Sequence, residues 1–245
     1  MDLERIKYYI LAALASVIAL TVHEVCHGYA AYKLGDNTAK NMGRLSLNPL
    51  KHLDPIGALC MIFFHIGWAK PVPINARNFK NPKRDFAICA AAGPLSNLIM
   101  GFFGAALYIL AHTLLLRVQS SDSEFLFNLA FNTRNFLSAF FVVNIGLGLF
   151  NLIPIPPFDG SRILHLVLPE KTYFEIMKYE RYIYYFMLGW LFLGDNVAAF
   201  LRSIPFISNS AVLYTVVGIF GLGDMISAAN NFVATAILNF WQLIF

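Results

Sequence analysis

The sequence predicts an all-α polytopic membrane protein, and three observations lead to this fold class. Among 245 residues, 58% are hydrophobic and 13% are charged, whereas a typical soluble domain has about 25% charged residues. The mean hydropathy is +0.61. The apolar residues also gather in runs that are long enough to cross a bilayer as helices, with polar loops between them.

The first apolar run, residues 8–32, is predicted to be a retained transmembrane helix. Arg5 and Lys7 precede it, as basic residues precede the core of a secretory signal. The run is longer than such a core, however, and cleavage near its end would discard its polar motif. Residues 35–37, Gly-Asp-Asn, break the helical periodicity, so we expect this helix to end there.

The polar motif of this helix is H-E-V-C-H at residues 23–27. Residues four apart on a helix face the same way, so His23 and His27 can bind one metal ion, for which zinc is the expected choice. Glu24 beside them is expected to take a proton from water at the metal and to deliver it to a leaving amine. A helical histidine is more often a packing residue than a ligand, but ionisable side chains in a membrane span are costly to bury and indicate function.

Cysteine content and net charge exclude several classes of protein. Cys26, Cys60 and Cys89 form no C-x-x-C pair, so neither a disulfide framework nor a thiolate zinc site is indicated. Cys26 lies on the metal-facing side of the first helix, where it either fills space as a small apolar residue or competes for the ion. The net charge of +4 does not indicate a nucleic-acid partner, because the basic residues cluster in loops between apolar runs.

Residues 36–85 combine polar turns with one short apolar piece, residues 56–68. A spanning helix needs about 20 residues, so this piece predicts an interfacial or re-entrant segment. Residues 71–75, Pro-Val-Pro-Ile-Asn, follow it. Their alternating prolines exclude a helix and predict a short, extended, β-like edge.

The second predicted span, residues 86–116, carries Gly-Pro-Leu-Ser-Asn at residues 93–97. Glycine and proline loosen a helix and let another backbone approach it. Asn97 places an amide at membrane depth. It is expected either to make a hydrogen bond between helices or to act as a donor near the metal, and both interpretations stay open.

The third apolar run begins at about residue 136 and ends in residues 151–160, Asn-Leu-Ile-Pro-Ile-Pro-Pro-Phe-Asp-Gly. The three prolines there unwind the helix end. Asp159 is the only carboxylate of this run, and a carboxylate beside unwound backbone at membrane depth needs a cation or another partner. Because two histidines leave a zinc site short of a third ligand, we expect Asp159 to complete a catalytic site with one position open for water.

Two further apolar segments, residues 182–201 and 211–245, are predicted to be additional membrane helices. Residues 33–84 contain nine of the eighteen Lys and Arg residues, and residues 160–181 contain four more. The positive-inside rule therefore places both connections in the cytoplasm and the N-terminus outside. The two basic residues before the first helix disagree with this orientation, and an additional interfacial turn at the N-terminus would account for them.

Three ordered motifs, at residues 23–27, 93–97 and 151–160, together resemble the site-2 protease family of intramembrane zinc metalloproteases. The loop strings Asp-Pro-Ile-Gly at residues 54–57 and Trp-Ala-Lys-Pro-Val-Pro-Ile-Asn at residues 68–75 resemble the compact bacterial and archaeal members, which carry no PDZ or CBS domain. The resemblance implies a three-helix catalytic core with the metal below the cytoplasmic surface, and it leaves regulation unexplained.

The resemblance covers about residues 15–165. It implies a catalytic core in residues 1–165 and about two to three flanking transmembrane helices in residues 166–245. It also implies a multi-pass protein of a prokaryotic cell membrane, with the active site towards the cytoplasm. The implied reaction is hydrolysis of a peptide bond within or near the transmembrane segment of a membrane-protein substrate. Residues 71–75 would then be an edge that pairs with an unwound substrate strand, and a rigid loop is the alternative because proline removes donors.

By the same resemblance, one Zn²⁺ per chain would be held by His23, His27 and Asp159. Glu24 would be the base, and Asn97 would help to position the substrate or the oxyanion. Two other classes of protein remain as alternatives. A membrane metal transporter is expected to show paired repeats, which this sequence does not, and a non-catalytic membrane scaffold has no need of Glu24. The oligomeric state stays open.

Overall fold

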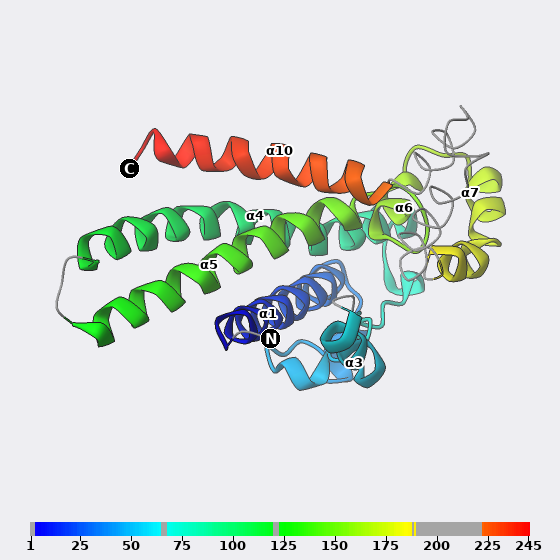
Figure 1. Ribbon diagram of the computed structural model, residues 1–245. Helices are drawn as coiled ribbons and strands as arrows, with labels where there is room; N and C mark the ends of the chain where they lie inside the picture. Colours follow the sequence, from blue (N-terminus) through cyan, green and yellow to red (C-terminus); the bar gives the residue numbers. More distant parts are fainter. Residues whose placement is uncertain (1–2, 65–67, 120–122, 188, 190–221) are drawn as a thin grey trace, which may run out of the picture.

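The computed structural model describes residues 3–64, 68–119, 123–187, 189 and 222–245, and these residues form an all-α protein. Three long helices dominate it: α1 (Leu3–Lys33), α4 (Pro82–Val118) and α5 (Glu124–Asn151). All three are long and apolar enough to cross a membrane, and they pack against one another (Figure 1). The predicted polytopic membrane fold is therefore confirmed.

The first helix extends beyond the predicted run at its N-terminal end. α1 begins at Leu3, and its first turns include an ion pair between Lys7 Nζ and Glu4 Oε1 at 2.8 Å. At 1.5 Å per residue, its 31 residues span about 46 Å, which exceeds the roughly 30 Å of a bilayer core. The basic N-terminal turns therefore have room to stand beyond the core, as the predicted extra turn requires. The helix ends just before Gly35, whose φ is 108°.

Small residues let α4 and α5 pack closely. A Cβ added to Gly101 would lie 2.5 Å from Cδ1 of Ile145, and one added to Gly148 would lie 2.7 Å from Cδ2 of Leu98. Such close approach is how membrane helices associate when lipid removes the hydrophobic driving force between them. A stripe of large apolar side chains on α4 remains exposed, as expected of a lipid-facing surface. Its members are Ile88, Leu95, Ile99, Phe103, Leu107, Leu110 and Leu114.

The start of the third long helix corrects the sequence-based boundary. α5 begins at Glu124, well before residue 136. Arg134 in this first half lies over the ring of Tyr108 at 5.6 Å, and its Nη2 donates a hydrogen bond to the Tyr108 hydroxyl at 3.3 Å. A partner on α4 thus makes a basic residue tolerable in a long apolar helix. Polar residues near Arg134 lower the mean hydropathy of this half of the helix, so a search for apolar runs misses it. They are Asn128, Asn132, Thr133 and Asn135.

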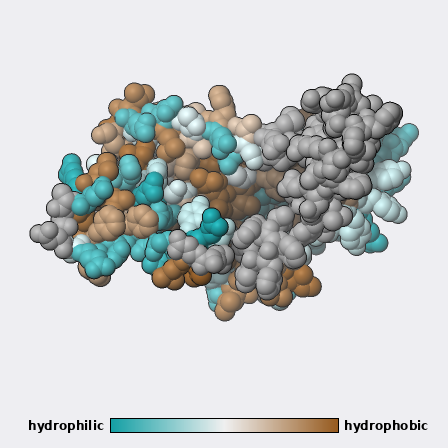
Figure 2. Space-filling model, in the orientation of Figure 1, coloured by the Kyte–Doolittle hydropathy of each residue, from teal (hydrophilic) through white to brown (hydrophobic). Residues whose placement is uncertain are grey.

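The described residues between α1 and α4 form four short helices. They are α2 (Thr38–Asn41), η1 (Pro49–Lys51), α3 (Pro55–Phe64) and η2 (Ala76–Asn78). The short apolar piece is α3, which has ten residues and exposes Ile56 and Leu59; Figure 2 shows hydrophobic side chains gathered around it. This length and exposure suit an interfacial or re-entrant segment. Residues 71–75 form no helix, as predicted, and no strand.

The C-terminal part contains α6 (Asp159–Leu164), α7 (Glu170–Met177), helical residues 180–187 and α10 (Leu222–Gln242). α10 lies along α4 and α5 (Figure 1), where Trp241 Nε1 donates to the carbonyl oxygen of Phe102 at 2.9 Å. Most of the predicted span 182–201 lies outside the described residues. α10 supplies the later part of the predicted span 211–245, but among the helices of the described residues it is not one of the three that are long and apolar enough to cross a membrane.

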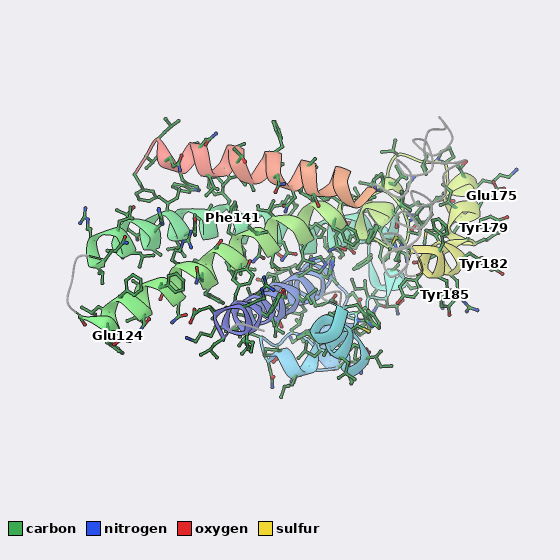
Figure 3. All side chains as sticks on the ribbon, viewed as in Figure 1. Glu124, Phe141, Glu175, Tyr179, Tyr182 and Tyr185 are labelled. Carbon is green, nitrogen blue, oxygen red and sulfur yellow. The ribbon has the colours of Figure 1, made fainter. Side chains whose placement is uncertain are left out.

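The two ends of the helix bundle carry different parts of the chain. Figure 3 shows Glu124 at one end and Tyr182 at the other, and Phe141 packed in the bundle between them. At the Tyr182 end, Nζ of Lys83 donates to the carbonyl oxygen of Leu168 at 3.2 Å. This hydrogen bond ties the first turn of α4 to the connection between α6 and α7. The two basic connections noted in the sequence therefore share one end of the bundle.

Candidate active site

Three side chains from two distant parts of the chain converge at the C-terminal half of α1. Nε2 of His23 and Nε2 of His27 lie 3.0 Å apart. Oδ2 of Asp159 lies 3.1 Å from the first nitrogen and 3.2 Å from the second. The structure thus brings together the three residues that the sequence predicts as zinc ligands.

Hydrogen bonds behind the two rings fix which nitrogen of each histidine carries the proton. Nδ1 of His27 lies 2.7 Å from the carbonyl oxygen of Cys89, which can only accept, so this nitrogen is the donor. Nδ1 of His23 lies 2.6 Å from Oδ1 of Asn97 and is the donor for the same reason. In a neutral imidazole the other nitrogen is then an acceptor. Both Nε2 atoms therefore present lone pairs to Asp159.

With both imidazoles neutral, two nitrogens and one carboxylate oxygen face one another with their lone pairs at about 3 Å, and a shared cation, a proton or a metal ion, removes their repulsion. Oδ2 of Asp159 is buried and makes no hydrogen bond within the described part of the chain. A tetrahedral zinc site with bonds of about 2.0–2.1 Å has edges of about 3.3 Å, close to the three observed distances. Two imidazole nitrogens and one carboxylate oxygen also form a known donor set of catalytic zinc sites. The residues present therefore fit a zinc ion.

Asn97 joins α4 to both other long helices. It is fully buried, and its Nδ2 donates to Oδ1 of Asn144 at 2.9 Å and to the carbonyl oxygen of Ala19 at 3.2 Å. Its Oδ1 accepts the hydrogen bond from His23. These contacts match the interpretation of Asn97 as a hydrogen-bonding residue between helices, and they use both hydrogens of its amide. Its place behind His23 makes it a support for a ligand.

Asn144 of α5 is a site residue that the sequence analysis does not single out. It is fully buried, accepts from Asn97 and donates from Nδ2 to the carbonyl oxygen of Phe140 at 2.8 Å. The signal that could have found it is the one applied to Asn97: an amide within an apolar membrane run needs a partner. A continuous chain of hydrogen bonds therefore runs from α5 through α4 to His23 on α1.

Gly93 provides the space for the two imidazoles. A Cβ added at this position would lie 2.8 Å from Cε1 of His23 and 2.6 Å from Cε1 of His27. The sequence predicts that this glycine lets another backbone approach, but two side chains of α1 occupy the space instead. Pro94 follows it inside α4, and the helix continues on both sides.

The connection between α5 and α6 brings Asp159 back to the histidines. α5 ends at Asn151, as the prolines after it require, and Asp159 is the first residue of α6. Gly160 packs against the chain that leaves α5, because a Cβ added there would lie 2.5 Å from the carbonyl oxygen of Ile153. This close backbone contact holds the start of α6, and with it Asp159, beside α1.

Glu24 follows His23 on α1 but is not part of the ligand group. Its Oε2 accepts a hydrogen bond from the backbone N–H of Val72 at 2.8 Å. Glu24 thus lies next to a ligand residue without competing for the metal, as expected of a base. Cys26 is partly buried and does not belong to the group of potential metal ligands found among the described residues, in agreement with a packing role.

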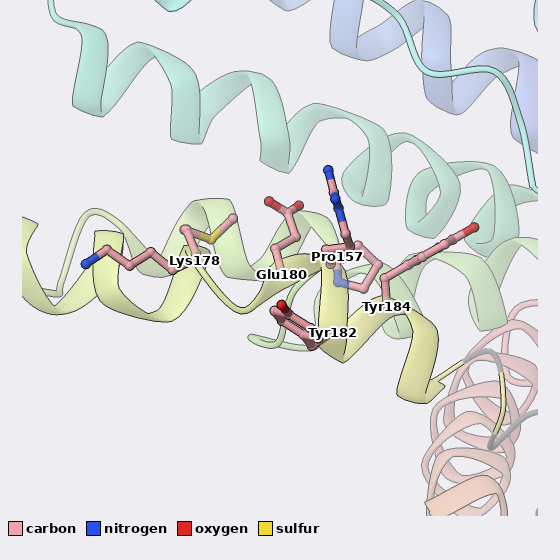
Figure 4. A pocket seen from close by; sticks show the side chains of 7 residues that line it. Pro157, Lys178, Glu180, Tyr182 and Tyr184 are labelled. Carbon is pink, nitrogen blue, oxygen red and sulfur yellow. The ribbon is translucent and has the colours of Figure 1, made fainter.

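A cavity of about 660 Å³ opens beside Pro157, two residues before Asp159 (Figure 4). Its lining includes none of the three predicted ligands. Glu180 in the lining is paired with Arg162, so Lys178 and Arg181 give the cavity a positive charge. It is therefore a neighbour of the metal group and not the metal site itself. The lining consists of Pro157, Met177, Lys178, Glu180, Arg181, Tyr182 and Tyr184.

Comparison with known proteins identifies the family of this chain. The profile of peptidase family M50 matches residues 10–194. "Putative zinc metalloprotease YwhC" of Bacillus subtilis is 38% identical over 185 residues, which are 74% of this chain and 81% of that protein. "Putative zinc metalloprotease Rip2" of Mycolicibacterium smegmatis is 28% identical over 69% of this chain and 62% of that protein. "Zinc metalloprotease MJ0392" of Methanocaldococcus jannaschii is 30% identical over 63% of this chain and 33% of that protein.

No solved structure matches the chain significantly. The family profile covers well over half of the chain, and the relative from Bacillus subtilis matches most of its own length. Among the described residues, His23, His27 and Asp159 form a group of potential metal ligands of the kind that a zinc enzyme requires. The chain therefore belongs to peptidase family M50, the site-2 protease family, and is a zinc metalloendopeptidase of the membrane.

Proposed function

We propose that this chain hydrolyses a peptide bond within or near the transmembrane segment of another membrane protein. The observation that carries the proposal is the depth of the ligand group. His27 lies six residues and His23 ten residues before Lys33, the last residue of α1, which corresponds to about 9 and 15 Å along the helix. With the end of α1 at the membrane surface, the reacting peptide bond has to enter the bilayer region to meet these side chains.

The side chains divide the chemistry between them. His23, His27 and Asp159 hold the zinc ion, which when bound supplies Lewis-acid polarisation and acidifies water. Glu24 takes the proton from the attacking water and delivers it to the leaving amine. Asn97 keeps Nδ1 of His23 hydrogen-bonded, so that Nε2 stays available as a ligand. Asn97 contributes by orienting this ligand, because its own amide hydrogens are already used.

We assign the catalytic core to residues 1–165 and a C-terminal helical part to residues 166–245. The two basic connections, which hold thirteen of the eighteen Lys and Arg residues, share the end of the bundle where α1 ends and α4 begins. The positive-inside rule places that end in the cytoplasm. Two bacteria and one archaeon supply the matched relatives, which supports a prokaryotic cell membrane as the location.

Cleavage in proteoliposomes tests the proposal. The purified chain is reconstituted with a peptide that has one transmembrane segment, and the products are identified by mass spectrometry. A soluble peptide with the same scissile sequence is the matched control. Cleavage of the soluble peptide alone would contradict hydrolysis within the membrane.

Three variants test the assigned roles. Glu24→Gln keeps the size of the side chain but removes the proton acceptor. It should therefore retain zinc, and its turnover number should fall by about 10²-fold to 10⁴-fold. His27→Ala and Asp159→Ala should lower the zinc content sharply from one ion per chain. Normal turnover in Glu24→Gln would contradict its role as base. Full zinc content in both ligand variants would contradict the metal site.

A further inference from the structure

The segment of residues 70–75 contacts Glu24 through one backbone hydrogen bond. The N–H of Val72 donates to Oε2 of Glu24 at 2.8 Å, and Val72 is 8% exposed. A hydrogen bond to a carboxylate is stronger than one between neutral groups. The donor also belongs to the backbone, so it cannot rotate away as a side chain can. The contact therefore ties the orientation of Glu24 to the position of this segment.

The close approach depends on Gly28, which lies one helical turn after Glu24 on the same face of α1. A Cβ added to Gly28 would lie 3.0 Å from Cγ1 of Val72 and 2.8 Å from Cδ2 of Leu45. Both distances are shorter than ordinary van der Waals contact, which begins at 3.4 Å. Glycine thus leaves the space in which the Val72 side chain packs while its N–H reaches Glu24.

Contacts on both sides of Val72 hold the segment in place. Before it, Nη2 of Arg44 donates to the carbonyl oxygen of Lys70 at 2.6 Å. After it, the N–H of Asn75 donates to Oδ2 of Asp36 at 2.7 Å. The segment is therefore fixed at two points beyond its contact with Glu24, and it does not depend on that contact for its position.

Asp36 is a charged anchor for this segment. Burial alone would raise the pKa of its carboxyl, but hydrogen bonds from Thr38, Asn75 and Asn78 outweigh burial and hold that pKa below its usual value. Asp36 therefore stays ionised at neutral pH, and its hydrogen bond to the backbone of Asn75 keeps the strength that charge gives it.

The prolines on either side make Val72 the single donor of its stretch. Pro71 and Pro73 have no N–H, so only one backbone hydrogen in residues 71–73 is available for hydrogen bonding. The N–H groups of Val72 and Asn75 are bound to carboxylates of this chain. These two donors are thus not offered to a substrate strand, so a pairing edge, one of the two interpretations of this segment, would have to use mainly its carbonyl groups.

We infer that the backbone N–H of Val72 is a positioning group for Glu24. The inference rests on the proposed role of Glu24 as the base. Holding one carboxylate oxygen, Oε2, leaves the other, Oε1, to accept the proton in a fixed orientation. Orientation matters because a base transfers a proton only when the two heavy atoms lie within about 2.6–3.2 Å.

Hydrogen exchange measures this contact without relying on cleavage. In peptides that span residues 71–73, the amide of Val72 is the one exchangeable backbone hydrogen of those three positions. Its exchange should be slow in the wild type and in Glu24→Gln, whose amide oxygen can still accept. It should be at least about 10-fold faster in Glu24→Ala and in Gly28→Ala, which displaces Val72. Equal exchange in the wild type and Glu24→Ala would overturn the inference.

An amide-to-ester substitution at Val72 removes the N–H and keeps the side chain. We expect kcat to fall about 10-fold to 100-fold with KM and zinc content unchanged, because a hydrogen bond to a charged group is lost. The same substitution at Ile74 is the matched control and should leave kcat unchanged. An unchanged kcat for the Val72 ester, or a loss of zinc from it, would overturn the inference. Normal cleavage by Glu24→Gln would instead overturn the role of Glu24 itself, so the two failures are distinguishable.

Discussion

Replacing Gly93 by alanine should lower zinc affinity at least about 100-fold while leaving the helices intact. The new Cβ would lie 2.6 Å from Cε1 of His27, whereas ordinary contacts begin at 3.4 Å. The ring would have to retreat by at least this difference, about 0.8 Å, because its Nε2 lies closer still. Bonds in a metal site tolerate deviations of about 0.2 Å, so a displacement about four times larger removes His27 from a coordinating position.

The expected magnitude follows from what the substitution takes away. Loss of a hydrogen bond behind a ligand lowers metal affinity by about 10-fold to 100-fold. Displacement of the ligand itself should exceed that range, so we expect zinc affinity at least about 100-fold lower and no detectable cleavage. The stability of helix α4 should not fall, because alanine is favoured over glycine within a helix by about 1 kcal/mol.

Zinc content after dialysis against graded chelator, together with thermal unfolding of the same samples, measures both effects. Gly146→Ala is the matched control, since a Cβ added to Gly146 in α5 would meet no heavy atom closer than 3.9 Å. It should keep the zinc affinity of the wild type. Wild-type affinity in Gly93→Ala would refute the reasoning that this glycine creates the space for the imidazoles.

Three further predictions test the support of the site, the orientation and the substrate. Asn144→Leu removes an acceptor of Asn97 and should lower zinc affinity about 10-fold to 100-fold in a chelator titration; unchanged affinity would show that Asn144 does not support His23. A cysteine at Lys40 should react only with thiol reagents admitted to the cytoplasm, and one at Glu124 only with reagents outside, so the inverse labelling would reverse the orientation. Substrates with Gly or Pro near the scissile bond should be cleaved faster than those with Leu, because these residues lower the cost of unwinding a helix by about 1 and 3 kcal/mol; rates independent of substrate helicity would contradict a need for unwinding.

The group of proposed metal ligands could be predicted from the sequence because each member is an exception in its surroundings. His23, His27 and Asp159 are ionisable groups in apolar runs, and the cost of burying them implies a common partner. The spacing of the two histidines along one helix also fixes their relative direction. Gly93 and Asn144 are different, since their roles depend on how α4 and α5 are rotated towards α1. Spacing within a helix does not determine that rotation.

The long helices could be predicted from hydropathy, but the start of α5 could not. Hydropathy treats Arg134 as a loop residue because it assigns one cost to a guanidinium group whatever lies beside it. In the folded chain that group lies over the ring of Tyr108, which lowers the cost of keeping it in the helix. The mean hydropathy of one segment contains no information about a partner that another helix supplies.

The donors of residues 71–75 limit how this protease can hold an unwound substrate. Pro71 and Pro73 have no N–H, and those of Val72 and Asn75 are bound within the chain. Under the proposed function, a substrate strand paired with this segment would therefore mainly donate its own N–H groups to the carbonyl groups of the segment. Those N–H groups lose their helical acceptors when a substrate helix unwinds, so the segment would replace the acceptors that unwinding removes. Because it would offer few donors in return, it would leave substrate carbonyl groups unpaired, and an unpaired carbonyl group is open to attack by water at the proposed zinc site.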